Sequence, residues 1–222
     1  TNSTHKPMSA FRQGSMILVW DEEFHHVEGP FQEAFLAHTS TSPNLQLIAS
    51  LDVARRQMEL EGYELTMNMT ELAIRIRSAV NNHPLISKYF KVATIEDMVP
   101  AEFRKSGIKD FGPPNSNWAD LVNAWDEDEF ALDPTRLTVI CGAAGFDIQI
   151  NKTSRNSILV QTNINNTHSD AALLIKALAD LSREIEQKLS DGGAPAKEAH
   201  AARVKSLMVD VPDLPNFSRF HD

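Results

Sequence analysis

The chain opens with a lysine whose neighbours are groups able to do chemistry. Lys6 follows directly on His5, and Ser3 lies three positions before it. A lysine amine forms a Schiff base only in its uncharged form, which burial and neighbouring groups can produce at neutral pH. His5 offers a proton-transfer group, Ser3 a hydroxyl suited to a phosphate oxygen, and Gln13 and Ser15 further polar contacts. Because most lysines are exposed, the same residues also fit a solvated surface pair.

Three other groups of polar residues have two interpretations each. His25 and His26 lie beside acidic residues and are candidate metal ligands, but adjacent histidines on a strand point to opposite faces, which favours a solvated loop. Arg155 fits a bidentate contact to a substrate carboxylate, or an exposed hairpin arginine. Residues 126–129 are most simply a solvated acidic turn. We therefore predict no metal site.

The composition favours some classes of protein and excludes others. With 222 residues, 42% of them hydrophobic, the chain can bury a core. A formal net charge of -9 without a cluster of Lys and Arg argues against a nucleic-acid partner and for a small molecule or another protein chain. The single cysteine, Cys141, and the lack of a run of about 20 apolar residues predict a cytoplasmic protein that does not enter a membrane. Because the chain begins at Thr1, we expect it to be a segment of a longer protein.

The N-terminal part reads as a strand followed by helices, which is typical of α/β proteins. The apolar run at residues 16–20 predicts a buried strand, and residues 31–37 predict a short helix. From Leu47 the apolar residues recur at spacings of four, three and four, which predicts a helix that Gly62 interrupts. A second helix is expected over 66–80, ending before a proline.

A second module of α+β type is expected from about residue 85. A short helix is predicted over 118–125, and near the end of the chain a linker at 191–195 is followed by a short helix over 196–208 and an extended stretch at 211–215. A longer helix over 170–189 is predicted to present one apolar face made of Leu174, Leu178, Leu181 and Ile185. The strand candidates are residues 89–93, 137–141, 148–150 and 157–162. The expected domains are 1–84, 85–190, and a linker and tail over 191–222.

Several motifs resemble one enzyme family. Thr1-Asn2-Ser3-Thr4-His5-Lys6, with Ser9-Ala10 and Gln13 after it, is similar to the cofactor attachment signature of the bacterial ornithine/lysine/arginine decarboxylases. The similarity extends to about residue 189 and looks closest to the arginine-decarboxylase-like members. Further stretches that resemble the family are His38–Pro43, Ser50–Val53, Leu132–Pro134 and Asn151–Asn156.

The resemblance implies pyridoxal 5'-phosphate as the cofactor and a role for six residues. Lys6 would hold the cofactor as a Schiff base, His5 would be its neighbour in the active site, and Ser3 would contact the phosphate. A further run is similar to a segment that reaches the cofactor site of the neighbouring subunit, although an ordinary helix-ending turn explains it equally well. This run consists of Thr39, Ser40 and Thr41.

The sequence departs from the family's pattern in two regions. Two cofactor-binding residues of the family would also lie outside the sequence. Arg12 and Gly14 replace residues of other types in the signature, and residues 143–147 run directly into 148–151, where the family has an intervening segment of about one helix. The family's aspartate at the pyridine nitrogen and the residue stacked on the ring precede the lysine. We therefore expect the isolated chain to bind the cofactor poorly and to be inactive.

The fold that the resemblance implies is α/β, the C-terminal part of an aspartate-aminotransferase-like pyridoxal-phosphate large domain, followed by an α+β C-terminal domain. The implied reaction is decarboxylation of a basic amino acid (arginine, lysine or ornithine) to the amine and carbon dioxide. The implied partners are that substrate and further copies of the chain, as a homodimer or higher homo-oligomer. Two alternatives remain open: an aminotransferase of the same fold, and a non-catalytic remnant or assembly module.

Overall fold

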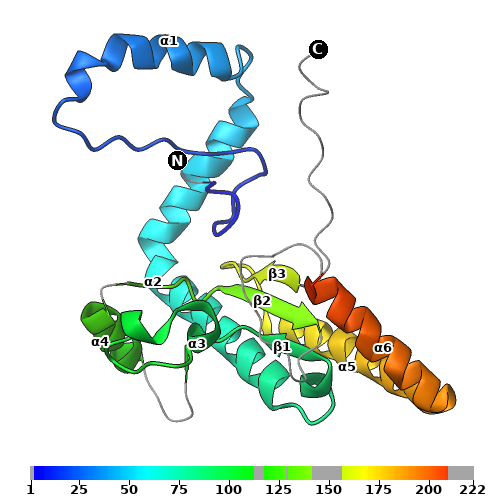
Figure 1. The fold of residues 1–222 in the computed structure, drawn as a ribbon. Coiled ribbons are helices and arrows are strands. Elements are labelled where there is room, and N and C mark those ends of the chain that lie inside the picture. The colour runs from blue at the N-terminus through cyan, green and yellow to red at the C-terminus, as the bar shows by residue number, and fades with distance from the viewer. Residues whose placement is uncertain (1–2, 113–117, 129, 142–156, 210–222) are drawn as a thin grey trace, which may run out of the picture. The chain divides into compact units, whose positions relative to one another are not determined.

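The computed structural model in Figure 1 combines helices with one small sheet, and it describes residues 3–112, 118–128, 130–141 and 157–209. The chain forms two compact units. The first contains residues 1–71 and 162–166, and the second contains residues 72–161 and 167–222. This division by contacts does not test the expected domain bounds, which stay predictions. In the described part of the chain, no helix is both long and apolar enough to cross a bilayer.

The helices of the first unit agree with the sequence pattern except at Gly62. A short 3-10 helix, η1 (Phe24–His26), precedes α1 (Glu28–His38), which confirms the helix predicted over 31–37. α2 (Leu45–Asn82) runs for 38 residues, so the predicted interruption at Gly62 is wrong. A glycine inside a helix costs only about 1 kcal/mol relative to alanine. Gly62 also leaves room for a neighbour, because a Cβ atom there would lie 3.1 Å from Cε of Met58.

The apolar run at residues 16–20 is not a buried strand. All five side chains are exposed, and that of Trp20 is completely so. A strand needs hydrogen-bonded neighbours and a covering layer. The sheet formed by the described residues lies in the second unit and does not include this segment. The prediction of a buried strand at residues 16–20 is therefore wrong, although the segment is apolar.

The second unit contains a three-stranded antiparallel sheet of order β1-β2-β3. Its strands are β1 (Phe90–Val92), β2 (Arg136–Cys141) and β3 (Ser157–Gln161), which confirms three of the four strand candidates. Val139 lies opposite Val92 of β1 and Ile158 of β3. The candidate at 148–150 lies outside the described residues, as do the shortened segment after residue 147 and the extended tail at 211–215.

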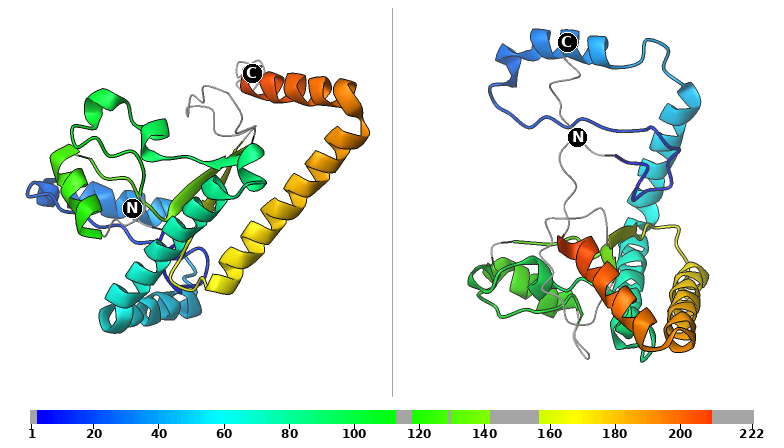
Figure 2. Two further views of the ribbon diagram at one scale, coloured as in Figure 1. Left: turned by 90° about the horizontal axis from the view of Figure 1, so that it is seen from below. Right: turned by 45° about the vertical axis from the view of Figure 1, so that its right-hand side comes forward.

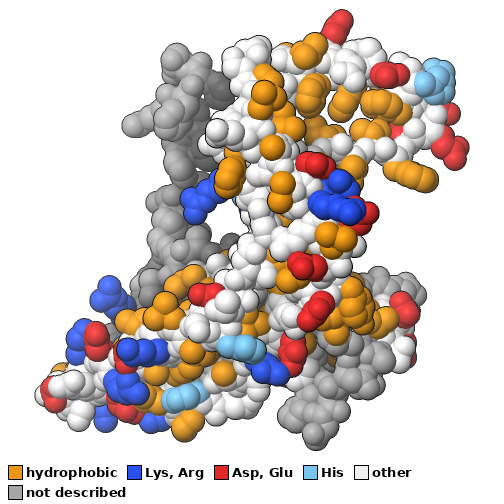
Figure 3. All heavy atoms as spheres, turned by 180° about the vertical axis from the view of Figure 1, so that it is seen from behind, with side chains coloured by type: hydrophobic (Ala, Val, Ile, Leu, Met, Phe, Trp, Pro, Cys, Tyr) orange, Lys and Arg blue, Asp and Glu red, His pale blue; other side chains and the backbone are white. Residues whose placement is uncertain are grey.

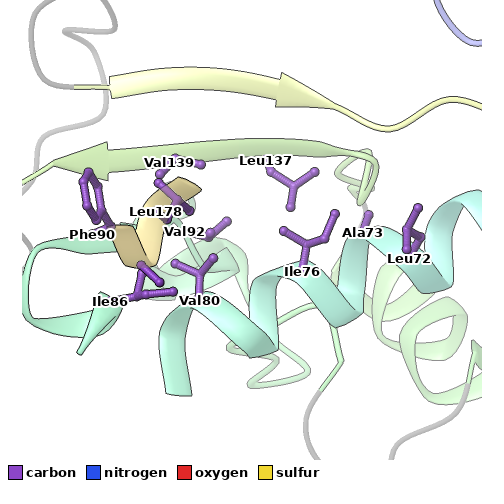
Figure 4. Close-up of a cluster of buried hydrophobic side chains, with 11 residues drawn as sticks. Leu72, Ala73, Ile76, Val80, Ile86, Phe90, Val92, Leu137, Val139 and Leu178 are labelled. Atoms are coloured by element: carbon purple, nitrogen blue, oxygen red, sulfur yellow. The ribbon is translucent and has the colours of Figure 1, made fainter. Parts of the chain in front are cut away.

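The main core lies on one face of this sheet, as Figure 4 shows. The C-terminal part of α2 directs Ile76 and Val80 toward β2, where Leu137 and Val139 meet them. Leu178 reaches the same cluster from α5 (His168–Asp191), which confirms the long helix predicted over 170–189. Burying each side chain of this size contributes about 1.5–3 kcal/mol. This cluster therefore supplies much of the stability of the second unit.

The buried face of α5 contains three of the four residues predicted for it, and the exception is Leu181. Leu181 is 48% exposed, whereas Ser182 is fully buried and donates a hydrogen bond to the Leu178 carbonyl at 2.7 Å. Positions 181 and 182 both lie about one turn after Leu178, so helical spacing alone does not decide which of them faces the sheet. α5 begins at a capping box in which Thr167 and Asp170 bond each other's backbone N–H.

The predicted linker at 191–195 is almost entirely helical. α5 ends at Asp191 and α6 (Gly193–Val209) begins two residues later, so only Gly192 lies between the helices. Gly193 has a φ of 63°, which a glycine adopts without strain and which lets the chain reverse. Figure 2 shows α6 turning back from the end of α5. The helix predicted over 196–208 is confirmed.

Short helices surround a second cluster, made of Ile95, Phe111 and Leu121. Leu121 comes from α4 (Trp118–Asp128), which confirms the helix predicted over 118–125. A capping box formed by Thr94 and Asp97 begins one of the other helices of this region. These are α3 (Ile95–Met98) and η3 (Ala101–Phe103). A further short helix, η2 (Ile86–Lys88), contributes Ile86 to the main core instead.

Candidate active site

The turn at the start of the first unit brings three of the predicted site residues together. The Lys6 amide donates to the Ser3 carbonyl at 3.1 Å, and the Met8 amide donates to the Thr4 carbonyl at the same distance. Thr4 is buried, whereas the side chains of Ser3 and Lys6 are exposed. Thr4 therefore anchors the turn in the interior, while the Lys6 amine and the Ser3 hydroxyl face solvent.

The backbone carbonyl of Gly14 orients two side chains of this turn. It accepts a hydrogen bond from the Thr4 hydroxyl at 3.2 Å and lies 2.9 Å from Nδ1 of His5. A carbonyl oxygen can only accept, so Nδ1 must carry the hydrogen in this contact. The Nε2 atom of a neutral His5 is then left with its lone pair, which can take up a proton.

The backbone at Gln13 and Gly14 makes this arrangement possible. Gln13 has a φ of 77°, a left-handed conformation that is uncommon for a residue with a side chain. A Cβ atom at Gly14 would lie 2.8 Å from Cδ2 of Leu51, so the glycine allows the chain to approach α2 closely. Gln13 and Ser15, predicted as polar contacts, are both exposed.

Hydrogen bonds to two other segments hold the turn within the first unit. The Phe11 amide donates to the Ser50 hydroxyl of α2 at 3.1 Å. The Ile164 amide donates to the Pro7 carbonyl at 3.3 Å, and the Ser9 hydroxyl donates to Oδ1 of Asn165 at 2.7 Å. The chemical groups of the turn are thus positioned by residues about 40 and 155 positions later in the chain.

The structure places the other predicted segment on a separate turn, after the end of α1. The backbone N–H and the hydroxyl of Thr39 both donate to the Phe35 carbonyl, at 2.9 and 2.7 Å. The hydroxyl of Ser40 accepts from the Ser42 amide at 3.1 Å, and Thr41 is exposed. These residues end a helix, as the alternative interpretation proposed. Whether they also reach a cofactor stays a prediction.

Sequence reasoning missed a side chain of the second unit that makes three hydrogen bonds, that of Arg77 of α2. Its Nη1 donates to the Ala93 carbonyl at 2.8 Å, and its Nη2 donates to the carbonyls of Pro134 and Arg136. The guanidinium also lies 4.1 Å from the centre of the Phe111 ring. Burial lowers the pKa of Arg77 to about 10, against the opposing charges of two nearby aspartates.

Two further polar residues have structural roles that the sequence did not reveal. Asp128 was predicted to belong to a solvated acidic turn, but it is buried at the end of α4. It accepts hydrogen bonds from the Ser106 amide at 2.6 Å and the Ser106 hydroxyl at 2.7 Å. Asn81 pairs with Val92 of β1 through both its amide nitrogen and its amide oxygen. The signal for Arg77 and Asn81 was their spacing, because they lie four and eight residues after the buried Ala73 on the same side of α2.

The remaining candidates do not form a site in the described part of the chain. His25 and His26 lie on η1 with their rings 3.8 Å apart, and His26 lies 3.5 Å from Glu23 at the surface. No group of three or more potential metal ligands occurs among the described residues. Arg155 lies outside these residues.

Comparisons with known proteins agree on one family. The family described as "Orn/Lys/Arg decarboxylase, major domain" matches residues 1–174. Lysine decarboxylase LdcA of Pseudomonas aeruginosa is 44% identical over 84 residues, which cover 37% of this chain and 11% of that protein. A lysine decarboxylase of Hafnia alvei is 34% identical over 143 residues, which cover 63% of this chain and 18% of the relative.

A solved structure supports the same assignment at the level of the fold. The lysine decarboxylase LdcF of Francisella novicida aligns with 83% of this chain and 28% of its own, with a TM-score of 0.51 and 23% identity. The chain thus spans less than a third of each of these three relatives. All three are lysine decarboxylases, so they do not favour the arginine members. From the match over residues 1–174, the chain belongs to the Orn/Lys/Arg decarboxylase family.

Proposed function

We propose that this chain contributes the cofactor lysine to a pyridoxal-phosphate-dependent decarboxylase of a basic amino acid: arginine, lysine or ornithine. The observation that carries the proposal is the family match from residue 1, which includes the turn with Ser3, His5 and Lys6. Membership of the family supports the general reaction. The cofactor, the substrate and the cytoplasmic location are our proposals.

The groups that this turn presents fit two parts of the cofactor. The Lys6 amine is exposed and can bond covalently to an aldehyde, and the Ser3 hydroxyl is exposed and can donate to a phosphate oxygen. When bound, pyridoxal phosphate supplies an electron sink for the bond that breaks at the substrate Cα. We assign Lys6 to covalent attachment and Ser3 to the phosphate.

His5 is suited to move a proton. Its Nδ1 atom is bonded to the Gly14 carbonyl, which fixes the ring and leaves Nε2 as the atom that exchanges protons. We propose that His5 Nε2 or the Lys6 amine donates the proton that replaces the carboxylate on the substrate Cα.

The full site is proposed to need a second copy of the chain. Thr39, Ser40 and Thr41 resemble the segment that reaches a neighbouring subunit, and all three are exposed. The exposed position of Lys6 points the same way, because a lysine that attacks carbonyl groups at neutral pH is normally desolvated. We therefore expect low or no decarboxylase activity from the chain by itself.

Absorbance and covalent trapping test the role of Lys6. The purified chain is mixed with pyridoxal phosphate, its spectrum is recorded near roughly 420 nm, and the product is reduced with borohydride and mapped by mass spectrometry. We expect the modified residue to be Lys6. The Lys6→Ala variant should lose the band, whereas Lys176→Ala, which removes an exposed lysine of α5, should keep it.

The outcomes separate the proposal from its alternatives. Labelling scattered over surface lysines, or an unchanged band in Lys6→Ala, would contradict the role of Lys6. For an assembly that does turn over amino acids, carbon dioxide as product supports the decarboxylase, and a keto acid supports an aminotransferase. The alternative of an assembly module is favoured by the many exposed apolar side chains of the first unit.

A further inference from the structure

Thr4 is a polar residue buried in a unit that exposes many of its apolar side chains. Figure 3 shows hydrophobic side chains, with charged groups among them, at the surface of the first unit. Thr4 is only 5% exposed, although it lies between Ser3 and His5 in the turn that carries the candidate site. Burying a hydroxyl costs free energy unless the hydroxyl makes a hydrogen bond. The buried position of Thr4 therefore depends on the partner of its hydroxyl.

That partner is a carbonyl whose direction its own residue does not fix. The Thr4 hydroxyl donates to the Gly14 carbonyl at 3.2 Å, across ten positions of the sequence. Glycine is free to adopt many backbone conformations, so Gly14 by itself allows its carbonyl several directions. A larger residue cannot restrict them without displacing α2, because a Cβ atom would lie 2.8 Å from Cδ2 of Leu51. The hydroxyl of Thr4 supplies the restriction that glycine lacks.

The same carbonyl faces the ring of His5. The Gly14 oxygen lies 2.9 Å from Nδ1 of His5, and its two lone pairs let it accept from the ring and from the Thr4 hydroxyl together. The hydrogen bond that a neutral histidine makes decides which of its ring nitrogens carries the hydrogen. If the carbonyl turned away, Nδ1 would lose its acceptor and the hydrogen would be free to occupy Nε2. Nε2 would then lack the lone pair that takes up a proton.

We propose that Thr4 is a positioning residue for His5, which acts through the Gly14 carbonyl to keep the hydrogen on Nδ1 and the lone pair on Nε2. The inference rests on the proposed function, in which His5 moves a proton at the substrate Cα. A second hydroxyl of the turn offers a comparison, because Ser9 donates to Oδ1 of Asn165 at 2.7 Å and not to Gly14. A merely structural role would make the two hydroxyls equivalent for His5.

Nitrogen-15 NMR of the full chain tests the role by measuring the two neutral forms of the His5 ring. The spectra are recorded at about pH 8.5, where imidazole groups are uncharged, and His5→Gln identifies the signals. The form with hydrogen on Nδ1 should dominate in the unmodified chain. Thr4→Val keeps the side-chain shape and should lower the ratio of this form to the other by about two- to fivefold, where fivefold corresponds to losing a hydrogen bond of about 1 kcal/mol. Thr4→Ser keeps the hydroxyl and should restore the ratio.

The control Ser9→Ala removes a hydrogen bond of the same turn and should leave the ratio unchanged. An unchanged ratio in Thr4→Val would overturn the proposal, as would an equal change in Ser9→Ala. A dominant Nε2–H form in the unmodified chain would overturn it even if Thr4→Val did not fold. Borohydride trapping on Lys6 tests the proposed function separately. Failure of that trapping, with the expected His5 ratios, would contradict the proposed function and leave the effect of Thr4 on His5 standing.

Discussion

Replacing Arg77 with methionine should destabilise the second unit by about 3 kcal/mol. Three backbone carbonyls, from the end of β1 and the approach to β2, accept hydrogen bonds from this one guanidinium. Methionine keeps much of the side-chain volume but removes every donor. The carbonyls would then be left without these bonds in a place from which water is largely excluded.

The size of the effect follows from two opposing contributions. A hydrogen bond from a charged donor contributes about 1.5–3 kcal/mol, so three of them contribute roughly 6 kcal/mol. The lowering of the Arg77 pKa to about 10 shows that burial disfavours the charged form. Converted to free energy, that penalty is roughly 3 kcal/mol, and methionine does not incur it. The difference leaves a net loss of about 3 kcal/mol.

Urea unfolding followed by tryptophan fluorescence measures the loss. Trp125 packs against the Phe111 cluster and reports on the second unit, and a Trp20→Phe background removes a fully exposed indole of the first unit. The control Arg183→Met removes an arginine of α5 whose side chain is 66% exposed, and it should change stability by less than about 1 kcal/mol. If Arg77→Met cost no more than this control, the hydrogen bonds to the three carbonyls would not stabilise the unit.

Two acidic residues of the second unit give further predictions. Asp128→Ala should lower the free energy of unfolding by about 3 kcal/mol in the same assay, because it removes both hydrogen bonds from Ser106. The control Glu127→Ala, at an exposed neighbouring position, should lower it by almost nothing. Equal losses of stability in the two variants would refute this prediction. Burial by itself would raise the pKa of Asp97, but hydrogen bonds from Lys91 and the N-cap threonine of α3 outweigh burial and lower that pKa. A lowered pKa stabilises the fold above the ordinary pKa of about 4, and this stabilisation disappears as the pH falls through the folded-state pKa. Asp97→Asn should therefore lower the free energy of unfolding by about 1 kcal/mol at pH 7 and by nearly nothing near pH 2. Urea unfolding at the two pH values measures both losses. The same loss at both pH values would contradict a stabilising role for the Asp97 carboxylate.

Most of the secondary structure could be predicted because its causes are local. Helical spacing indicated the first part of α2 and α5, and β-branched residues indicated β2 and β3. The family could also be identified, since the motif around Lys6 consists of consecutive residues. What failed locally was the break at Gly62, where the cost of one glycine is small compared with the packing of a 38-residue helix.

Burial was harder to predict than element type. The run at residues 16–20 was predicted to be buried, yet it is exposed. An apolar run indicates that a segment is suited to burial, but it does not indicate which other segment packs on it. Asp128 shows the opposite error: an acidic residue next to exposed ones is buried because Ser106, 22 positions earlier, donates two hydrogen bonds to it.

The sequence by itself determined the family, the residue that is proposed to hold the cofactor, and most of the longer helices and the strands of the sheet. Only the tertiary structure showed that Gly14 orients His5 and that Arg77 bonds to Arg136, 59 positions away. Helix caps and apolar periodicity act over about four residues, whereas these contacts depend on how distant segments pack. Packing decides which polar groups lose water, and that loss makes Arg77 a structural residue and leaves Lys6 exposed in this chain.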